Sequence, residues 1–400
     1  MPARKPTALN VARYRVDTAH HPEPRGNRYF GAHRLPVNFQ TIVDPNRNPP
    51  QPWRDLPPPT GSAPYHMDLS SILAPESIDS IVQNGSMIFH AVGDTGGVNT
   101  PTQIENVESF MESDFSNPDI TTHPSFFYHL GDVVYYEGEL QNYFPEFYEP
   151  YMNYPGPIVA IPGNHDGDVD PQTGESSLEG FVRNFCSQAP VHTPEAGDSP
   201  RTAMTQPNVY WTFLTPLVTI IGLYSNCPEG GQLSQAQIDW FLSELANAPK
   251  DRAVIVAVHH PIYSAYGSKP GSQHLYAMLN SAATTTGRVP ELVLTGHVHD
   301  YQRFTGTLAG KDVPMIIAGA GGYNAKLHTL HKAFHTTKLP ITIPGAGGIL
   351  ENFCDDQHGY LRIKVTKKAV LVEYVAVPDP GSGKKGPLKA FDSITIKTKY

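Results

Sequence analysis

The stretch Gly131-Asp132-Val133-Val134-Tyr135 decides the fold and the site that this sequence predicts. It follows the apolar run Phe126-Phe127-Tyr128-His129-Leu130, which is typical of a buried strand, and Gly131 ends that run. A carboxylate therefore stands at the carboxyl end of a strand, with a phenol three residues later. An aspartate in this place is more often a helix cap than a ligand. The stretch gains its meaning from other strands of the chain that end in the same way.

Length, charge and cysteine count limit the class of protein. The 400 residues are enough for one large domain or two ordinary ones. The formal net charge of -9 argues against binding of bulk nucleic acid, which needs a basic face, but not against a small anionic substrate held beside metal ions. The three cysteines are widely spaced and odd in number, so they predict no disulfide framework and suit a reducing compartment.

Targeting signals and domain boundaries complete the outline. Residues 1–28 contain no apolar core of a signal peptide, and no run of about eighteen apolar residues predicts a membrane span, so we expect a cytoplasmic protein. We expect a proline-rich arm over 1–84, a catalytic body over 85–378 and a tail over 379–400. The arm is either disordered or laid over the body, and its interspersed aromatic residues favour the ordered alternative.

The body predicts alternating strands and helices. Helices are expected over 101–115, from a cap at Ser234 to about 245, and over 273–283, and a long surface excursion over 167–207. Strands are expected over 87–92, 126–130, 157–161, 209–214, 217–223, 253–258, 291–294, 314–318, 360–365, 369–377 and 393–397.

Metal-ligand side chains follow five of these strands. Steps of 38 residues from Asp94 to Asp132, and of 32 from Asp132 to Asn164, match strand-helix-strand units. Parallel strands built in this way present their ligands at one edge of the sheet. The side chains expected to converge there are Asp94, Asp132, Asn164, His259, His297 and His299.

These donors suit a pair of metal ions. Carboxylate, amide oxygen and imidazole together favour iron, manganese or zinc. Six such donors and the Tyr135 phenol exceed what one ion needs, whereas two ions that share a carboxylate would use them all. Two metals roughly 3.5–4 Å apart are the arrangement of phosphoester hydrolysis. The alternative is that these residues are strand-end caps and satisfied core histidines.

The order of five short motifs resembles that of the calcineurin-like metallophosphoesterases, most nearly the purple acid phosphatase branch. The motifs are Gly-Asp-x-Gly at 93–96, Gly-Asp-x-x-Tyr at 131–135, Gly-Asn-His-Asp at 163–166, His-x-Pro at 259–261 and Gly-His-x-His at 296–299. The resemblance covers 87 to about 325 and implies a four-layer αββα sandwich of two mixed sheets flanked by helices.

The resemblance also implies roles for individual residues. One ion, Fe(III), would be held by Asp94, Asp132, Tyr135 and His299, and a second, Fe, Mn or Zn, by Asp132, Asn164, His259 and His297. A metal-bound hydroxide would attack phosphorus. His165 would stabilise the phosphoryl oxygens or protonate the leaving group, oriented by Asp166.

Two positions depart from the superfamily pattern. Most members place a histidine where this chain has Gly96, and Tyr135 would replace that donor, as it does in the purple branch. Purple phosphatases also place a further histidine where this chain has Ser268; His274 is a candidate substitute, although a surface histidine is the simpler interpretation. His328, His331 and His335 would share one helical face, solvated or on the substrate side.

The function predicted is hydrolysis of phosphate esters, monoesters before diesters, with a small phosphoester as substrate. One alternative is a phosphodiesterase acting on nucleotides or lipid head groups. Another is a scaffold that keeps the fold without catalysis.

Overall fold

Buried parallel strands form the centre of two mixed sheets. The computed structural model describes residues 7–8, 55–97, 101–168, 176–227, 230–343, 348–384 and 386–398. The first sheet has the order β16-β15-β14-β3-β4-β5, in which β3, β4 and β5 run parallel and the other neighbours antiparallel. Its strands are β3 (Ser86–Val92), β4 (Pro124–His129), β5 (Ile158–Ala160), β14 (Gly359–Thr366), β15 (Ala369–Ala376) and β16 (Asp392–Lys397).

The second sheet has the order β1-β12-β13-β10-β11-β9-β8-β7-β6-β2, and β7, β8, β9 and β11 run parallel at its centre. Its strands are β1 (Thr7–Ala8), β2 (His66–Asp68), β6 (Trp211–Leu214), β7 (Val218–Leu223), β8 (Ala253–Val258), β9 (Leu292–Thr295), β10 (Tyr301–Leu308), β11 (Lys311–Ala318), β12 (Ile341–Thr342) and β13 (Ile349–Cys354).

Apolar side chains pack between the sheets and on their outer faces. Strand β8 is Ala-Val-Ile-Val-Ala-Val, and its side chains alternate between the two faces. Ile255 packs in the core between the sheets with Phe89 of the other sheet. Val256 packs on the outer face, where α5 and α6 supply Phe241 and Leu279. A strand that is buried on both faces is therefore apolar throughout.

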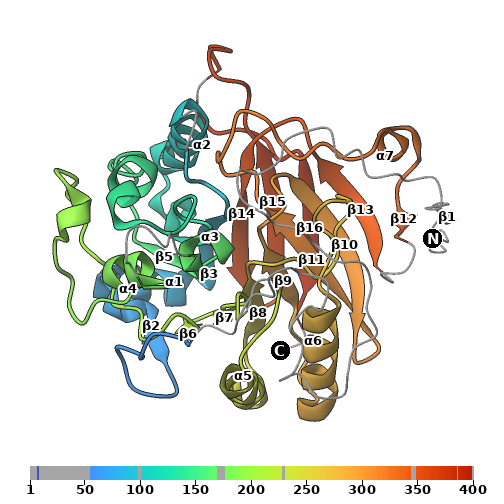
Figure 1. The fold of residues 1–400 in the computed structure, drawn as a ribbon, viewed down its shortest axis with the longest axis horizontal. Coiled ribbons are helices and arrows are strands. Elements are labelled where there is room, and N and C mark those ends of the chain that lie inside the picture. Colours follow the sequence, from blue (N-terminus) through green and yellow to red (C-terminus); the bar gives the residue numbers. More distant parts are fainter. Residues whose placement is uncertain are drawn as a thin grey trace.

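Helices cover both outer faces. α5 (Gln235–Asn247) and α6 (Gln273–Thr286) cover the ten-stranded sheet and lie together at the lower edge of Figure 1. α2 (Pro101–Ser113) and α4 (Glu179–Phe185) pack against the six-stranded sheet, at the left of the same view. The layers thus run helix, sheet, sheet, helix, which confirms the predicted αββα sandwich.

Shorter helical elements connect the layers. They are Leu69–Ser71, α1 (Pro75–Asn84), Asp114–Ser116, Ile120–Thr122, Leu140–Asn142, a π-helical turn at Phe144–Tyr148, α3 (Asn164–Gly167), Pro194–Ala196 and α7 (Lys332–Thr336). None of the helices within the described ranges has the length and apolar character that crossing a bilayer requires.

The structure corrects several sequence predictions. The excursion over 167–207 contains α4, whose Phe181 and Phe185 are fully buried, so part of it belongs to the core. Strands β10 and β13 were not predicted, because Tyr301–Leu308 and Ile349–Cys354 mix polar and apolar residues in the manner of one-sided strands.

The predicted domain boundaries stay a prediction, but neighbouring elements extend the sandwich beyond them. β2 and α1 precede residue 85, and β16 follows residue 378 while pairing with β15 along its whole length. The rest of the predicted arm, 1–54 apart from Thr7–Ala8, lies outside the described residues.

The predicted cap of α5 gives a direct test of the local structure. The Ser234 side chain accepts a hydrogen bond from the Gln237 backbone N–H, which is otherwise one of the free donors of the first turn. Ser234→Ala should lower the free energy of unfolding by about 1 kcal/mol. Ser243→Ala, an exposed serine inside the same helix, is the control and should change it by less than about 0.5 kcal/mol in urea unfolding. Equal effects of the two substitutions would contradict the capping role.

Candidate metal centre

The carboxyl ends of parallel strands from both sheets meet at the candidate site. Asp94 and Asp132 follow β3 and β4, and their loops are joined because the Asp94 N–H donates to the Gly131 carbonyl at 3.0 Å. His259 follows β8 directly, and the Gly296 N–H donates to its carbonyl at 2.9 Å. The chain direction within each sheet therefore brings residues from four distant segments to one edge.

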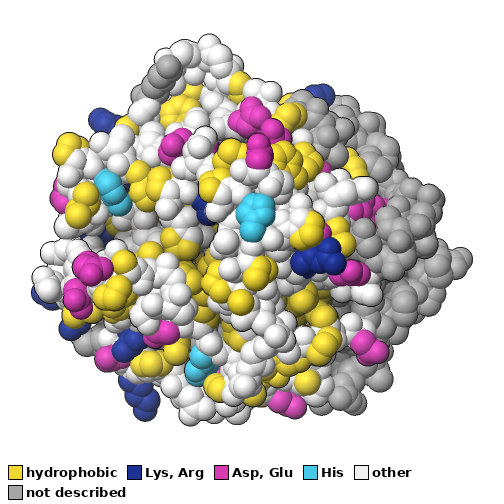
Figure 2. Space-filling view, turned by 90° about the vertical axis from the view of Figure 1, so that its left-hand side faces the viewer, with side chains coloured by type: hydrophobic (Ala, Val, Ile, Leu, Met, Phe, Trp, Pro, Cys, Tyr) yellow, Lys and Arg dark blue, Asp and Glu magenta, His cyan; other side chains and the backbone are white. Residues whose placement is uncertain are grey.

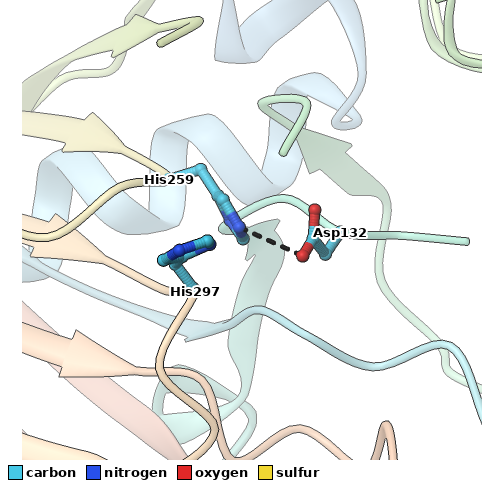
Figure 3. A group of neighbouring side chains, drawn as sticks. All are labelled: Asp132, His259 and His297. Carbon is cyan, nitrogen blue, oxygen red and sulfur yellow. Dashed lines mark ion pairs between the residues drawn. The ribbon is translucent and has the colours of Figure 1, made fainter. Parts of the chain in front are cut away.

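Asp132 lies at the centre of the cluster. Its Oδ2 is 3.2 Å from His259 Nε2 and 3.2 Å from the Tyr135 hydroxyl. Ligand atoms of Asp132, His259 and His297 all lie within 4.8 Å of one another. Figure 3 shows the two imidazoles and the carboxylate facing a common point from different loops.

The remaining predicted donors surround this group. Asp94 Oδ1 is 3.3 Å from His299 Nε2, 3.5 Å from the Tyr135 hydroxyl and 3.9 Å from His259 Nε2. Asn164 Oδ1 is 2.9 Å from a ring nitrogen of His297. The structure thus brings together all seven predicted ligands: Asp94, Asp132, Tyr135, Asn164, His259, His297 and His299.

Three of these residues hold a backbone conformation that side chains rarely adopt. The φ angles are +57° at Asp94, +53° at Asp132 and +71° at His297. Non-glycine residues in this region cost of order 1–3 kcal/mol each and cluster at functional sites. Gly163 shows a related constraint, because a Cβ there would lie 2.0 Å from Asp132 Oδ1. The loops are therefore shaped around the position of the Asp132 carboxylate.

The donor atoms suit metal ions. The His259 Nδ1–H donates to the Leu130 carbonyl at 2.8 Å, which directs Nε2 toward Asp132. His299 Nε2 is buried without a hydrogen bond, and burial lowers the pKa of His299 well below its ordinary value. A neutral imidazole with an unused nitrogen lone pair beside a carboxylate is suited to bind a metal ion.

The family match agrees with this geometry. A family model described as calcineurin-like phosphoesterase matches residues 87–301, more than half of the chain. The chain belongs to the calcineurin-like phosphoesterase family. The search of curated proteins gives no match to this sequence.

Two solved structures share the fold of this phosphoesterase at low identity. A purple acid phosphatase, PPD1, from yellow lupin (Lupinus luteus) seeds has a TM-score of 0.54 and 15% identity; the match covers 79% of this chain and 54% of the lupin chain. GAP50, the anchor in the inner membrane complex of Plasmodium, has a TM-score of 0.52 and 16% identity, over 79% of this chain and 90% of that one. The chain thus spans about half the length of the lupin protein.

Burial and neighbouring charges set the ionisation of the phosphoesterase site. Burial raises the pKa of Asp94 to about 7. Burial alone would also raise the pKa of Asp132, but His259 and His165 hold it below its ordinary value. Burial alone would lower the pKa of His259, but Asp132 and Asp94 raise it to about 9. Metal binding at His259 would therefore release a proton.

Tyr135 fills the space left by the departure at Gly96. A Cβ on Gly96 would lie 2.8 Å from Tyr135 Cδ2 and 2.6 Å from Glu146 Oε2, so a side chain there and the present tyrosine exclude one another. Glu146 accepts the Tyr135 backbone N–H at 2.7 Å. The glycine and the tyrosine form one structural unit.

His165 and Asp166 have different surroundings from those predicted. His165 Nδ1 is 2.7 Å from the Tyr136 carbonyl oxygen, and the His165 N–H donates to Asp132 Oδ1 at 2.9 Å. The Asp166 carboxylate accepts the backbone N–H groups of Gly163 at 2.7 Å, Val133 at 3.0 Å and Val134 at 3.3 Å. Asp166 thus ties the Asp132 loop to the Asn164 loop, and the Tyr136 carbonyl orients His165.

Sequence reasoning missed two residues beside the ligands and misplaced a third. His328 was expected on a helix, but α7 begins at Lys332, and the His328 ring stacks on His299 with centroids 4.2 Å apart. The Tyr323 ring lies 4.1 Å from Tyr135. Buried Lys269 donates to the His297 carbonyl at 2.9 Å. In the sequence, the signal for Lys269 was the departure from the family pattern at the preceding residue, Ser268.

The position of the missing outer histidine, Ser268, and its candidate substitute, His274, have these surroundings. Ser268 is exposed. His274 is on the first turn of α6, where it lines a small cavity with Gln232 and Met278.

Proposed function

We propose that this phosphoesterase hydrolyses phosphate monoesters with two metal ions. The observation that carries the proposal is the position of Asp132, whose Oδ2 is 3.2 Å from both the Tyr135 hydroxyl and His259 Nε2. A carboxylate between a phenol and an imidazole is suited to bridge two ions. A metal pair, when bound, would acidify a water and neutralise charge on the transferring phosphoryl group.

We assign the donors to two ions that share Asp132. Asp94, Tyr135 and His299 would hold the first, and the 3.3 Å between Asp94 Oδ1 and His299 Nε2 supports their grouping. Asn164, His259 and His297 would hold the second, which the contact of Asn164 with His297 supports. A phenolate is a hard anionic donor, so we assign ferric iron to the first group and iron, manganese or zinc to the second.

His165 is the proposed proton donor of the reaction. Its ring is 4.4 Å from the Tyr135 ring between centroids, and it is 6% exposed. Since the Tyr136 carbonyl accepts from Nδ1, the opposite ring nitrogen is directed away from that anchor. We assign to it the contact with the phosphoryl oxygens or with the leaving group, whose protonation makes it easier to expel. A role of Asp166 in the reaction stays a prediction, with backbone positioning as the simpler role.

Tyr135→Phe tests the metal assignment. In protein purified without chelators, the wild type should bind two ions and show a visible phenolate-to-iron absorption band, which the variant should lack. Tyr136→Phe, which removes the neighbouring half-buried hydroxyl, is the matched control and should keep the band. Metal analysis and a visible spectrum provide the measurement. An active, colourless wild-type enzyme would overturn the ferric assignment and leave the phosphoesterase proposal standing.

Two alternatives are separable by experiment. Turnover of an aryl phosphate diester faster than the monoester would favour a phosphodiesterase of nucleotides or lipid head groups. The second alternative is a scaffold without catalysis; GAP50, which shares the fold, is named as an anchor. The full donor set argues against the scaffold, which would gain support if metal-loaded protein hydrolysed no phosphoester.

The proposed partner is a small phosphoester. On the coloured part of the face in Figure 2, Lys and Arg side chains are spread among acidic ones and form no continuous stripe. A polymeric phosphate backbone is bound by such stripes. The exclusion of nucleic acid and the cytoplasmic location both stay predictions.

A further inference from the structure

We propose that Lys269 is a positioning residue that holds the loop carrying His297 and His299 in its metal-binding conformation. The inference rests on the proposed metal centre. It assigns a function to a buried residue that lies outside the proposed ligand set and directly follows the exposed Ser268.

The Lys269 side chain reaches the loop from a separate, anchored segment. Its Nζ donates to the His297 carbonyl oxygen at 2.9 Å, and the residue is only 4% exposed. Its backbone N–H donates to the Tyr266 carbonyl, and the nearby Ser272 N–H donates to the Pro261 carbonyl at 2.8 Å. The ammonium group therefore approaches His297 from a segment that is itself fixed next to His259.

The His297 peptide is the point at which this contact matters. His297 has a φ of +71°, and its own N–H donates to Asp94 Oδ2 at 2.8 Å. Rotation of the peptide that follows His297 would swing its carbonyl away from Lys269 and change the path of the chain toward His299. The Lys269 ammonium opposes that rotation by a charge-assisted hydrogen bond. Outer partners of this kind orient metal ligands and typically affect metal affinity 10–100-fold.

The charge of Lys269 suits the same task. Its positive charge acts on Asp94 and Asp300, both fully buried carboxylates near the loop. Burial of an ammonium group is costly for the fold. A lysine at this position is therefore unfavourable for stability alone. Its charge is useful if the side chain orients the loop that carries His297 and His299.

The test compares Lys269→Met with Lys269→Arg in the full chain. Protein stripped of metal is titrated with Mn²⁺ by calorimetry, and the Tm of the metal-free protein is recorded. We expect Lys269→Met to lower Mn²⁺ affinity 10–100-fold with an unchanged or higher metal-free Tm, and Lys269→Arg to recover most of the loss. Ser268→Ala, the exposed neighbour, is the control and should bind as the wild type does.

Three outcomes would overturn the proposal. Lys269→Met could bind Mn²⁺ as tightly as the wild type, Lys269→Arg could bind as weakly as Lys269→Met, or Lys269→Met could lower the metal-free Tm or fail to fold, which would make the role structural. A wild-type protein that binds metal but hydrolyses no phosphoester would overturn the proposed function and leave this comparison of affinities valid.

Discussion

Asp132→Asn should lower kcat/KM for an aryl phosphate monoester by at least about 1,000-fold, equivalent to about 4 kcal/mol of transition-state stabilisation. The reason is that Asp132 is the carboxylate placed between Tyr135 and His259, at 3.2 Å from each. An amide is a neutral and weaker ligand, so both ions should be lost or displaced. Activity on the monoester and metal content per chain provide the measurement.

The same substitution should leave the metal-free fold intact. The amide oxygen of the variant could still accept the His165 N–H that Asp132 Oδ1 now accepts at 2.9 Å, and the buried charge is removed. The metal-free protein should therefore still fold, but with a lower Tm, because the variant leaves the buried His259 imidazole, whose Nε2 is 3.2 Å from Asp132 Oδ2, without its ion-pair partner. Asp119→Asn, an exposed carboxylate in a turn, is the control and should keep full activity. An Asp132→Asn enzyme with more than a tenth of wild-type activity would contradict a shared carboxylate.

The convergence of the proposed ligands could be predicted from the sequence, because most of them follow a buried strand within a few residues. Asp132 and His259 stand within a few residues of β4 and β8, so strand direction alone places them at one edge. Only a few residues separate each of these side chains from its strand, with no long loop between them. The strands therefore fix the distances among the side chains. The αββα layering was implied by a family resemblance, since apolar runs do not reveal how two sheets stack.

The supporting residues could not be predicted, because their positions depend on tertiary contacts. Lys269 meets His297 across 28 positions of sequence, and nothing in either segment indicates that the side chain turns inward. His328 was misplaced because three histidines at helical spacing favour a helix, whereas α7 begins only at Lys332 and His328 packs on His299. Asp166 was predicted to orient His165, but its carboxylate accepts hydrogen bonds from backbone amides 32 and 33 residues away.

A second large effect is expected far from the metal centre, at Asp114. This carboxylate follows α2 and is 8% exposed. Its oxygens accept hydrogen bonds from His90 Nε2 at 3.0 Å, the Tyr360 hydroxyl at 2.9 Å and the Arg362 guanidinium at 2.6 and 2.9 Å. His90 is on β3, and Tyr360 and Arg362 are on β14, so one side chain ties a helix end to two neighbouring strands.

Asp114→Ala should lower the free energy of unfolding at pH 7 by about 3–5 kcal/mol, because it leaves a partly buried guanidinium and a buried imidazole without their common acceptor. Asp114→Asn keeps one acceptor oxygen and should lose less. Asp79→Ala, an exposed aspartate inside α1 and outside the cluster, should lose less than about 0.5 kcal/mol. Urea unfolding followed by circular dichroism gives the three values.

The effect of Asp114→Ala should also depend on pH with a definite sign. Burial alone would raise the pKa of Asp114, but the hydrogen bonds from His90 and Arg362 lower it below its ordinary value. A carboxylate with a lowered pKa in the folded state contributes its full stability above its unfolded pKa of about 3.9, and that contribution is lost as the pH falls through the folded value. The difference in the free energy of unfolding between wild type and variant should therefore be constant from pH 5 to 7, because this range lies above the unfolded pKa of about 3.9. The difference should shrink as the pH falls below about 3.9. A difference that grows on acidification would mean that the folded protein holds Asp114 protonated, and the ion cluster would then have no stabilising role.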